Sequence, residues 1–180
     1  MWPSDEVIDK CILELLKDRS IQNLLDLGTG AGRVLRTIAP FVVKGTGIDN
    51  SLEMLSIARA RLDQDGIKNC QVRVGDMYRL PFKQNSFDLI TINSLLRYAE
   101  EPKKVIAEAA RVLEKKGALL IVDLAAHDLS ELRDEYGHSW LGFSEAEMLE
   151  MLSEENLTVA RVKHIDGQKL NVCIWLASGS

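Results

Sequence analysis

The stretch Leu24-Leu25-Asp26-Leu27-Gly28-Thr29-Gly30-Ala31-Gly32 decides the fold of this chain. An apolar run ends in an acid, three glycines follow at alternate positions, and Arg33–Ala39 then has the spacing of a helix that Pro40 stops. Glycines at such a turn let the backbone reverse and approach a ligand closely, which a Cβ would prevent. The stretch therefore predicts a strand, a glycine turn and a helix, with either a ligand at the turn or a tight turn that binds nothing.

The spacing of the glycines argues against a nicotinamide dinucleotide. That fingerprint has its third glycine one place later, where this chain has Arg33. A carboxylate, Asp49, closes the next apolar run about twenty residues after the turn, where dinucleotide folds place the acid that holds ribose hydroxyls. Asp49 could also cap the helix that follows it. The glycine turn and the acid together favour the ribose interpretation.

Strand and helix patterns alternate along the chain, which predicts an α/β fold with a parallel sheet covered by helices on both faces. The segment 125–142 is long, polar and aromatic, without a clear period, and is expected to be a loop. The expected helices are Ser4–Lys17, Arg33–Ala39, Leu52–Leu62, Lys103–Leu113 and Ser144–Glu155. The expected strands are Asn23–Leu27, Phe41–Ile48, Gln71–Val74, Ser86–Asn93, Ala118–Asp123, Thr158–Ile165 and Leu170–Leu176, the last two forming an antiparallel hairpin.

Length and composition restrict the class of protein. The 180 residues, 46% of them hydrophobic, fit one domain over 1–180. A net charge of -5 argues against nucleic acid as a partner. No apolar run is long enough for a membrane helix and Met1–Lys10 is charged, so a cytoplasmic location without membrane contact is expected. The three cysteines (Cys11, Cys70 and Cys173) lack metal-ligand spacing, so we expect reduced thiols and no metal site.

Four ordered motifs extend the pattern over most of the chain. They read LDLGTGAG, GTGIDNSLEMLSIAR, VGDMYRLPFKQNSFDLI and EPKKVIAEAARVLEKKGALLIVD. The segment Asp26–Asp123 that contains them resembles class I S-adenosylmethionine-dependent methyltransferases. The resemblance implies a Rossmann-like three-layer sandwich with a mostly parallel seven-stranded sheet and an antiparallel C-terminal hairpin. In addition, Ala126–Asp128 and Leu132–Met148 resemble the methyltransferase module that follows an ArsR-like winged-helix domain in some bacterial proteins.

The resemblance implies S-adenosylmethionine as the cofactor and assigns the residues that hold it. Those expected at the methionine end, the sugar and the sulfonium are Asp26, Gly28, Thr29, Gly30, Asn93 and Ser94. Those expected at the ribose hydroxyls and the adenine are Asp49, Asn50, Asp76 and Met77. All of them sit at the carboxyl ends of strands, where open α/β sheets bind ligands.

The expected reaction is methyl transfer to a small-molecule acceptor. The chain reads Asn93-Ser94-Leu95-Leu96 where methyltransferases of nucleic acid or protein amides carry an NPPY-like tetrapeptide. It also has Arg97 where relatives of similar type often have a histidine, which leaves His127 and Tyr98 as candidate catalytic residues. The alternative is a regulatory module that binds S-adenosylmethionine or S-adenosylhomocysteine without turnover. A homodimer is compatible with the sequence.

Overall fold

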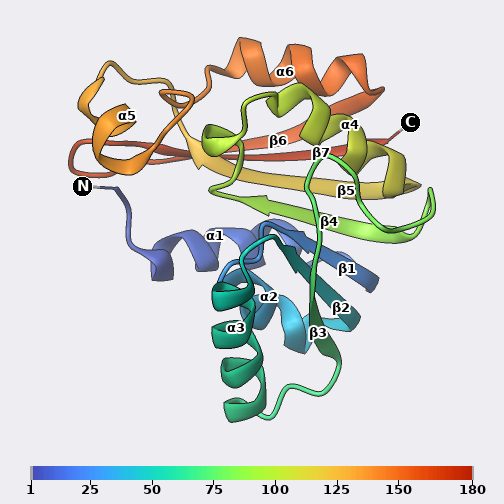
Figure 1. The fold of residues 1–180 in the computed structure, drawn as a ribbon. Coiled ribbons are helices and arrows are strands. Elements are labelled where there is room, and N and C mark those ends of the chain that lie inside the picture. Colours follow the sequence, from blue (N-terminus) through green and yellow to red (C-terminus); the bar gives the residue numbers. More distant parts are fainter. Residues whose placement is uncertain (1, 180) are drawn as a thin grey trace.

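The computed structural model describes residues 2–179, and these form one seven-stranded sheet in the order β3-β2-β1-β4-β5-β7-β6 (Figure 1). The first five strands in that order are parallel, and β7 runs antiparallel to both β5 and β6. The strands are β1 (Ile21–Leu27), β2 (Val42–Asp49), β3 (Cys70–Val74), β4 (Phe87–Asn93), β5 (Leu113–Leu124), β6 (Leu157–Ile165) and β7 (Val172–Gly179). The helices are α1 (Asp5–Leu16), α2 (Arg33–Ile38), α3 (Leu52–Gln64), α4 (Pro102–Val112), α5 (Glu131–Tyr136) and α6 (Glu145–Glu154), with 3-10 turns η1 (Ala39–Phe41) and η2 (Leu96–Tyr98).

The central strands are buried on both faces, which is why they are apolar without interruption. Along β5, Leu120 packs into the core beneath α1, α2 and α3, whereas its neighbour Leu119 packs into the core beneath α4 and α6. Figure 1 shows these two helical layers on opposite faces of the sheet. The predicted three-layer sandwich, the mostly parallel sheet and the antiparallel C-terminal strands are therefore confirmed.

Two details differ from the sequence prediction. The strand β5 begins at Leu113 instead of Ala118, because Leu113 pairs with Phe87 before a register shift that leaves the polar residues 114–116 exposed. The expected loop over 125–142 contains the helix α5, which Gly137 ends in a left-handed conformation with φ 67°. Only Leu132 of α5 is buried, so the segment carries no apolar period that would reveal a helix.

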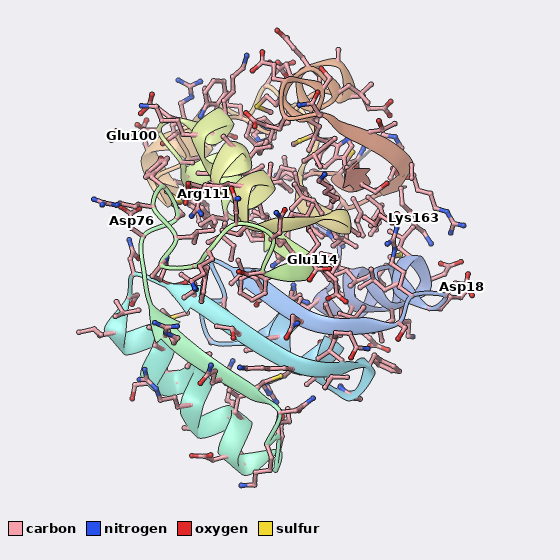
Figure 2. The ribbon with its side chains drawn as sticks, turned by 90° about the vertical axis from the view of Figure 1, so that its right-hand side faces the viewer. Asp18, Asp76, Glu100, Arg111, Glu114 and Lys163 are labelled. Carbon is pink, nitrogen blue, oxygen red and sulfur yellow. The ribbon has the colours of Figure 1, made fainter. Side chains whose placement is uncertain are left out.

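The topology brings several strand ends to one place. From β1 the chain moves outward to β2 and β3, and it then returns to the other side of β1 as β4. The change of direction creates a crevice beyond the carboxyl ends of β1 and β4, the usual ligand position in open α/β sheets. Figure 2 shows Asp76 and Glu100 on this side of the molecule, with Asp18 and Lys163 on the opposite side. No helix between residues 2 and 179 has the length and apolarity needed to cross a bilayer.

Candidate functional site

The glycine turn after β1 is packed directly on the backbone of β2. Gly28 and Gly30 have positive φ values of 73° and 53°, which favour glycine strongly. The backbone N–H groups of Gly28 and Thr29 both donate to the carbonyl oxygen of Ile48, at 2.8 and 2.9 Å. A Cβ on Gly47 would lie 2.7 Å from the Thr29 hydroxyl oxygen, so the lack of a side chain on Gly47 of β2 permits this approach.

Asp49 joins the end of β2 to the same turn. Its carboxylate accepts hydrogen bonds from the backbone N–H of Gly30 at 2.8 Å and from that of Ser51 at 2.9 Å. The cap of α3 is Ser51, whose hydroxyl oxygen accepts from the N–H of Met54 at 3.2 Å. Helix capping is thus performed by Ser51. Because a carboxylate offers about four acceptor positions, Asp49 can still accept from two hydroxyl groups.

Asp26 lies behind the turn and is buried, at 2% exposure. Its two carboxylate oxygens accept from the hydroxyls of Thr29 and Thr91, both at 2.7 Å. Burial raises the pKa of Asp26, and the hydrogen bonds from Thr91 and Thr29 partly oppose that rise. Through these two hydrogen bonds Asp26 connects the glycine turn to β4.

A cavity of about 350 Å³ opens at the ends of β1, β2 and β3. Its lining combines backbone from the glycine turn, carboxylates and apolar side chains, a mixture that suits an organic ligand with a few polar groups. The lining residues are Leu27, Gly28, Ile48, Asp49, Asn50, Gly75, Asp76, Met77, Tyr78, Leu95 and Tyr98. We call this space the strand-end cavity.

The strand-end cavity brings together half of the residues expected to hold a cofactor. They are Gly28, Asn50, Asp49, Asp76 and Met77, and the candidate Tyr98 lines the cavity with them. The other expected residues, which do not line it, are Asp26, Thr29, Gly30, Asn93, Ser94 and the candidate His127. Sequence reasoning did not single out Leu95 and Tyr78, whose only signal is that each follows a strand end.

Asp76 and Ser94 adopt local conformations set by hydrogen bonds. The carboxylate of Asp76 accepts from the backbone N–H of Tyr78 at 2.9 Å, which closes a tight turn at the rim of the cavity. Ser94 has a positive φ of 55°, and its N–H donates to the carbonyl oxygen of Val122 at 2.7 Å. The chain therefore turns sharply after β4 and passes Leu95 and Tyr98 over the cavity.

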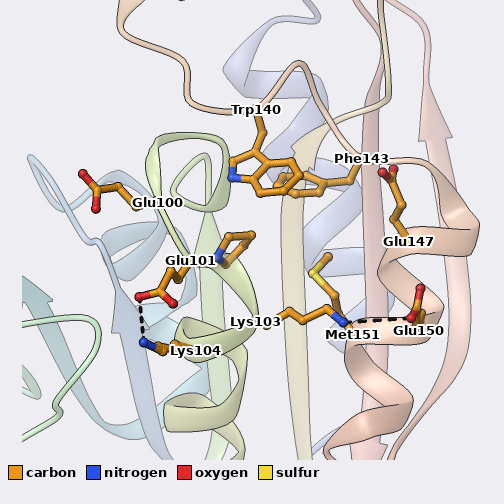
Figure 3. A pocket seen from close by; sticks show the side chains of 10 residues that line it. Glu100, Glu101, Lys103, Lys104, Trp140, Phe143, Glu147, Glu150 and Met151 are labelled. Carbon is orange, nitrogen blue, oxygen red and sulfur yellow. Dashed lines mark hydrogen bonds and ion pairs between the residues drawn. The ribbon is translucent and has the colours of Figure 1, made fainter.

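A larger cavity of about 440 Å³ lies between α4 and α6 (Figure 3). Trp140 stacks on Phe143 with ring centroids 5.8 Å apart, and its indole N–H donates to the carbonyl oxygen of Ala99 at 2.9 Å. Glutamates surround the opening, and Lys104 pairs with Glu101 at 2.7 Å. Although it is larger, this cavity is bounded mainly by helix side chains, whereas the strand-end cavity lies where the glycine turn and the strand-end carboxylates meet. The strand-end cavity is therefore the better candidate site.

Beyond the strand-end cavity, a buried ion pair connects the segment after β4 to β5. The guanidinium of Arg97 donates from Nη1 to a carboxylate oxygen of Asp123 at 2.9 Å, and Arg97 also lies 5.2 Å from the centre of the Tyr98 ring. Two histidines of the 125–142 segment, His127 and His138, are close enough to Arg97 for its charge to help lower the pKa of each, although burial is the larger cause.

Residues 2–179 contain no group of three or more histidine, cysteine, aspartate or glutamate side chains arranged to hold an ion. The three cysteines are free thiols, and burial raises the pKa of Cys70 and of Cys173 to about 11. Such thiols are poorly reactive at neutral pH.

Comparison with known proteins identifies the class. The model of a methyltransferase-domain family matches residues 18–173, so the chain belongs to this family. Among curated relatives, demethylmenaquinone methyltransferase of Thermotoga maritima is 39% identical over 118 residues, which cover 64% of this chain and 49% of that protein. The chain thus spans about half the length of the curated relatives that it matches.

Solved structures share the fold. The crystal structure of YcgJ from Bacillus subtilis has a TM-score of 0.80 at 19% identity, with 97% of this chain and 99% of that chain covered. A geranyl diphosphate methyltransferase solved in complex with S-adenosylmethionine has a TM-score of 0.83 at 17% identity, covering 98% of this chain and 86% of that chain. At these identities the likeness concerns the fold alone.

Proposed function

We propose that this protein is an S-adenosylmethionine-dependent methyltransferase that acts on a small-molecule acceptor, with residues 1–180 forming one methyltransferase domain. The observation that carries the proposal is the strand-end cavity, where the bare backbone of Gly28 and the carboxylates of Asp49 and Asp76 border one space. Membership of the methyltransferase family supports methyl transfer as the reaction.

The residues of the cavity fit the cofactor. A Cβ on Gly28 would lie 2.8 Å from the Leu95 side chain, so only glycine leaves this part of the cavity free. The carboxylate of Asp49 would accept hydrogen bonds from both ribose hydroxyls. The carboxylate of Asp76 would accept one from the adenine amino group, and the backbone N–H of Met77 would donate to the adenine ring. When bound, the cofactor supplies an electrophilic methyl group on a sulfonium.

The other expected residues act at the methionine end. Thr29 and Gly30 form the turn, Asp26 holds that turn against β4, and Asn93 and Ser94 border the reacting centre. Their task is to orient the reactants and exclude water, because methyl transfer depends chiefly on placing the acceptor in line behind the methyl group.

A small organic acceptor is supported by the names of several relatives and by the charge of the chain. Demethylmenaquinone methyltransferase and geranyl diphosphate methyltransferase are both named for small molecules. The net charge of -5 gives no general attraction for nucleic acid. On the sequence alone, the likeness of Leu132–Met148 to the module that follows ArsR-like domains suggests a wider regulatory context.

Calorimetric titration with S-adenosylmethionine and S-adenosylhomocysteine tests cofactor binding. We expect both to bind, and Asp49→Ala to weaken binding by roughly 1.5–3 kcal/mol, the range for hydrogen bonds that involve a charged group. Asp18→Ala is the matched control, because Asp18 is exposed and lies on the opposite side of the molecule. Absence of binding by the folded wild-type protein would exclude the proposed cofactor.

Turnover is tested separately with a methyl donor that carries a labelled methyl group. The protein is incubated with fractionated small molecules, and products are sought by mass spectrometry. A labelled small molecule together with S-adenosylhomocysteine is the expected result. Cofactor binding without any labelled product would favour the regulatory alternative.

A further inference from the structure

Unpartnered polar atoms are concentrated beside the strand-end cavity. Six buried side-chain nitrogen or oxygen atoms lack a hydrogen-bond partner within residues 2–179, and five of these belong to four residues at the end of β4 and in the segments that follow β4 and β5. They are Asn93 Oδ1, Arg97 Nε, His127 Nε2, and both ring nitrogens of His138. Because a buried polar atom without a partner destabilises a fold, a cluster of five requires an explanation. We call these four residues the polar cluster.

His138 is the centre of the polar cluster. Its side chain is buried, at 3% exposure, and its ring meets the Tyr98 ring edge to face with centroids 5.1 Å apart. Tyr98 in turn lines the strand-end cavity. His138 therefore lies directly behind a side chain that borders the expected cofactor position.

Backbone hydrogen bonds hold His138 in this place without using its ring. The N–H groups of Ser139 and Trp140 donate to the carbonyl oxygen of Arg97 at 2.8 and 3.0 Å. The Trp140 indole adds a bond to the Ala99 carbonyl oxygen. The segment after α5 is thus attached to the segment after β4, while both imidazole nitrogens of His138 stay available.

The hydrogen-bonding capacities of the polar cluster define the ligand that would satisfy it. His127 accepts at Nδ1 from the N–H of Leu129 at 3.2 Å, so its neutral form carries the proton on Nε2 and donates there. Arg97 Nε is a further donor, Asn93 Oδ1 is an acceptor, and neutral His138 has one donor and one acceptor nitrogen. An anion would leave the acceptors facing negative charge, and a quaternary ammonium would leave the donors unpaired. A hydroxyl or amine group, which both donates and accepts, matches the set.

We propose that the polar cluster binds the reacting group of the methyl acceptor, that this group is an O–H or N–H, and that His138 accepts its proton. The inference rests on the proposed methyltransferase function. In the step, the lone pair of the acceptor oxygen or nitrogen forms a bond to the methyl carbon. The carbon–sulfur bond breaks with its electron pair on sulfur, and the proton passes to the free ring nitrogen of His138.

The electrostatic surroundings keep this base neutral. Burial lowers the pKa of His138, Arg97 and His127 lower it further, and Asp123 opposes them. Access depends on Tyr98, whose side chain separates His138 from the cavity. Tyr98 is 42% exposed, and turning its ring aside would give up the contacts with His138 and Arg97 but open the way from the cavity to His138.

Phenol and anisole are matched probes, because they differ mainly in the presence of the O–H proton. Protein with isotope-labelled histidine rings is saturated with S-adenosylhomocysteine and titrated with each probe by NMR. Phenol is expected to shift the ring signals of His138 saturably, whereas anisole leaves them unchanged. His164 on β6, which hydrogen-bonds Cys173 on β7 and Glu145 on α6, is the internal control. Equal responses to both probes, or no response, would overturn the inference.

The variant His138→Phe gives an independent readout. Phenylalanine has no ring nitrogens that need partners. If His138 is retained for function at the expense of stability, His138→Phe should therefore raise the Tm by about 2–4 °C. It should also weaken phenol binding by up to about tenfold, the effect of one lost hydrogen bond, and leave affinity for S-adenosylhomocysteine unchanged. His164→Phe should not alter phenol binding. Unchanged phenol binding in His138→Phe would refute the role of His138, whereas loss of cofactor binding by the wild type would refute the underlying function instead.

Discussion

The carboxylate of Asp26 accepts a 2.7 Å hydrogen bond from the hydroxyl of Thr91, which lies beside it on β4. Both residues are buried, Thr91 completely. The bond therefore joins the strand that carries the glycine turn to the strand beyond which the polar cluster begins. Removing this buried hydrogen bond should lower the free energy of unfolding more than removing an exposed hydrogen bond would.

Thr91→Val keeps the side-chain shape but removes the hydroxyl, so one oxygen of a buried carboxylate loses its partner. We expect a loss of roughly 1.5–3 kcal/mol in the free energy of unfolding, measured by urea denaturation. Thr37→Val is the control, because Thr37 makes a similar bond to Asp9 in a partly exposed position. Its cost should be below about 1 kcal/mol. Equal costs for the two variants would contradict the importance of burial.

The close approach of β2 to the glycine turn is tested by Gly47→Ala. The added Cβ would lie within 2.8 Å of three Thr29 side-chain atoms, so the turn must move and cofactor affinity should fall at least about tenfold. Gly66→Ala is the control, since Gly66 has a φ of 67° but an added methyl group there would meet no other atom within 4 Å. That variant should lose about 1–2 kcal/mol of stability and keep full affinity. Calorimetry and urea denaturation together separate the two effects.

These residues also show how far sequence reasoning reaches. Gly28 and Asp49 are identifiable because a glycine turn and a strand-end acid occupy fixed positions in an alternating fold. The start of β5 is not identifiable in this way, since residues 114–116 are charged and lie where the register shifts, between the pairs Phe87–Leu113 and Leu89–Ala118. That His138 lies close to Arg97 and Tyr98 is also not apparent from the sequence, because no spacing links these residues. Their proximity arises from backbone hydrogen bonds between distant loops.

The buried ion pair of Arg97 and Asp123 should respond differently to single and double substitution. Arg97→Met leaves a buried carboxylate without its cation and should cost about 3–5 kcal/mol in the free energy of unfolding. Arg97→Met combined with Asp123→Leu removes both charges, and we expect the double variant to be more stable than Arg97→Met alone. Chemical denaturation of the wild type, Arg97→Met, Asp123→Leu alone and the double variant gives the coupling energy between the two side chains. A double variant that loses the sum of both single effects would show that the two side chains act independently.

The contribution of His138 to stability should decrease as the pH falls below the ordinary histidine pKa of 6.5, because burial and the charge of Arg97 lower the pKa of this residue in the folded state. The unfolded chain then binds a proton that the folded chain does not, which favours unfolding at lower pH. This single histidine contributes at most about 1.4 kcal/mol per pH unit. The groups that set its pKa besides burial are Arg97, His127 and Asp123.

Urea midpoints measured between pH 7.5 and pH 5 test this dependence, since Glu108 and Glu147 have pKa values lowered from 4.5 and titrate below that range. His138→Phe should flatten the slope. A slope identical to that of the wild type would mean that His138 is protonated equally in the folded and unfolded chains.

The position of β7 between β5 and β6 has a consequence for folding. Although β6 precedes β7 in the chain, it contacts the sheet only through β7 and cannot join before that strand is present. During translation, β5 therefore keeps an open, apolar edge while α5, α6 and β6 emerge from the ribosome. Such an edge invites pairing with other chains. Nascent chains stalled before Val172 should consequently recruit chaperones, and chains that already contain β7 should not.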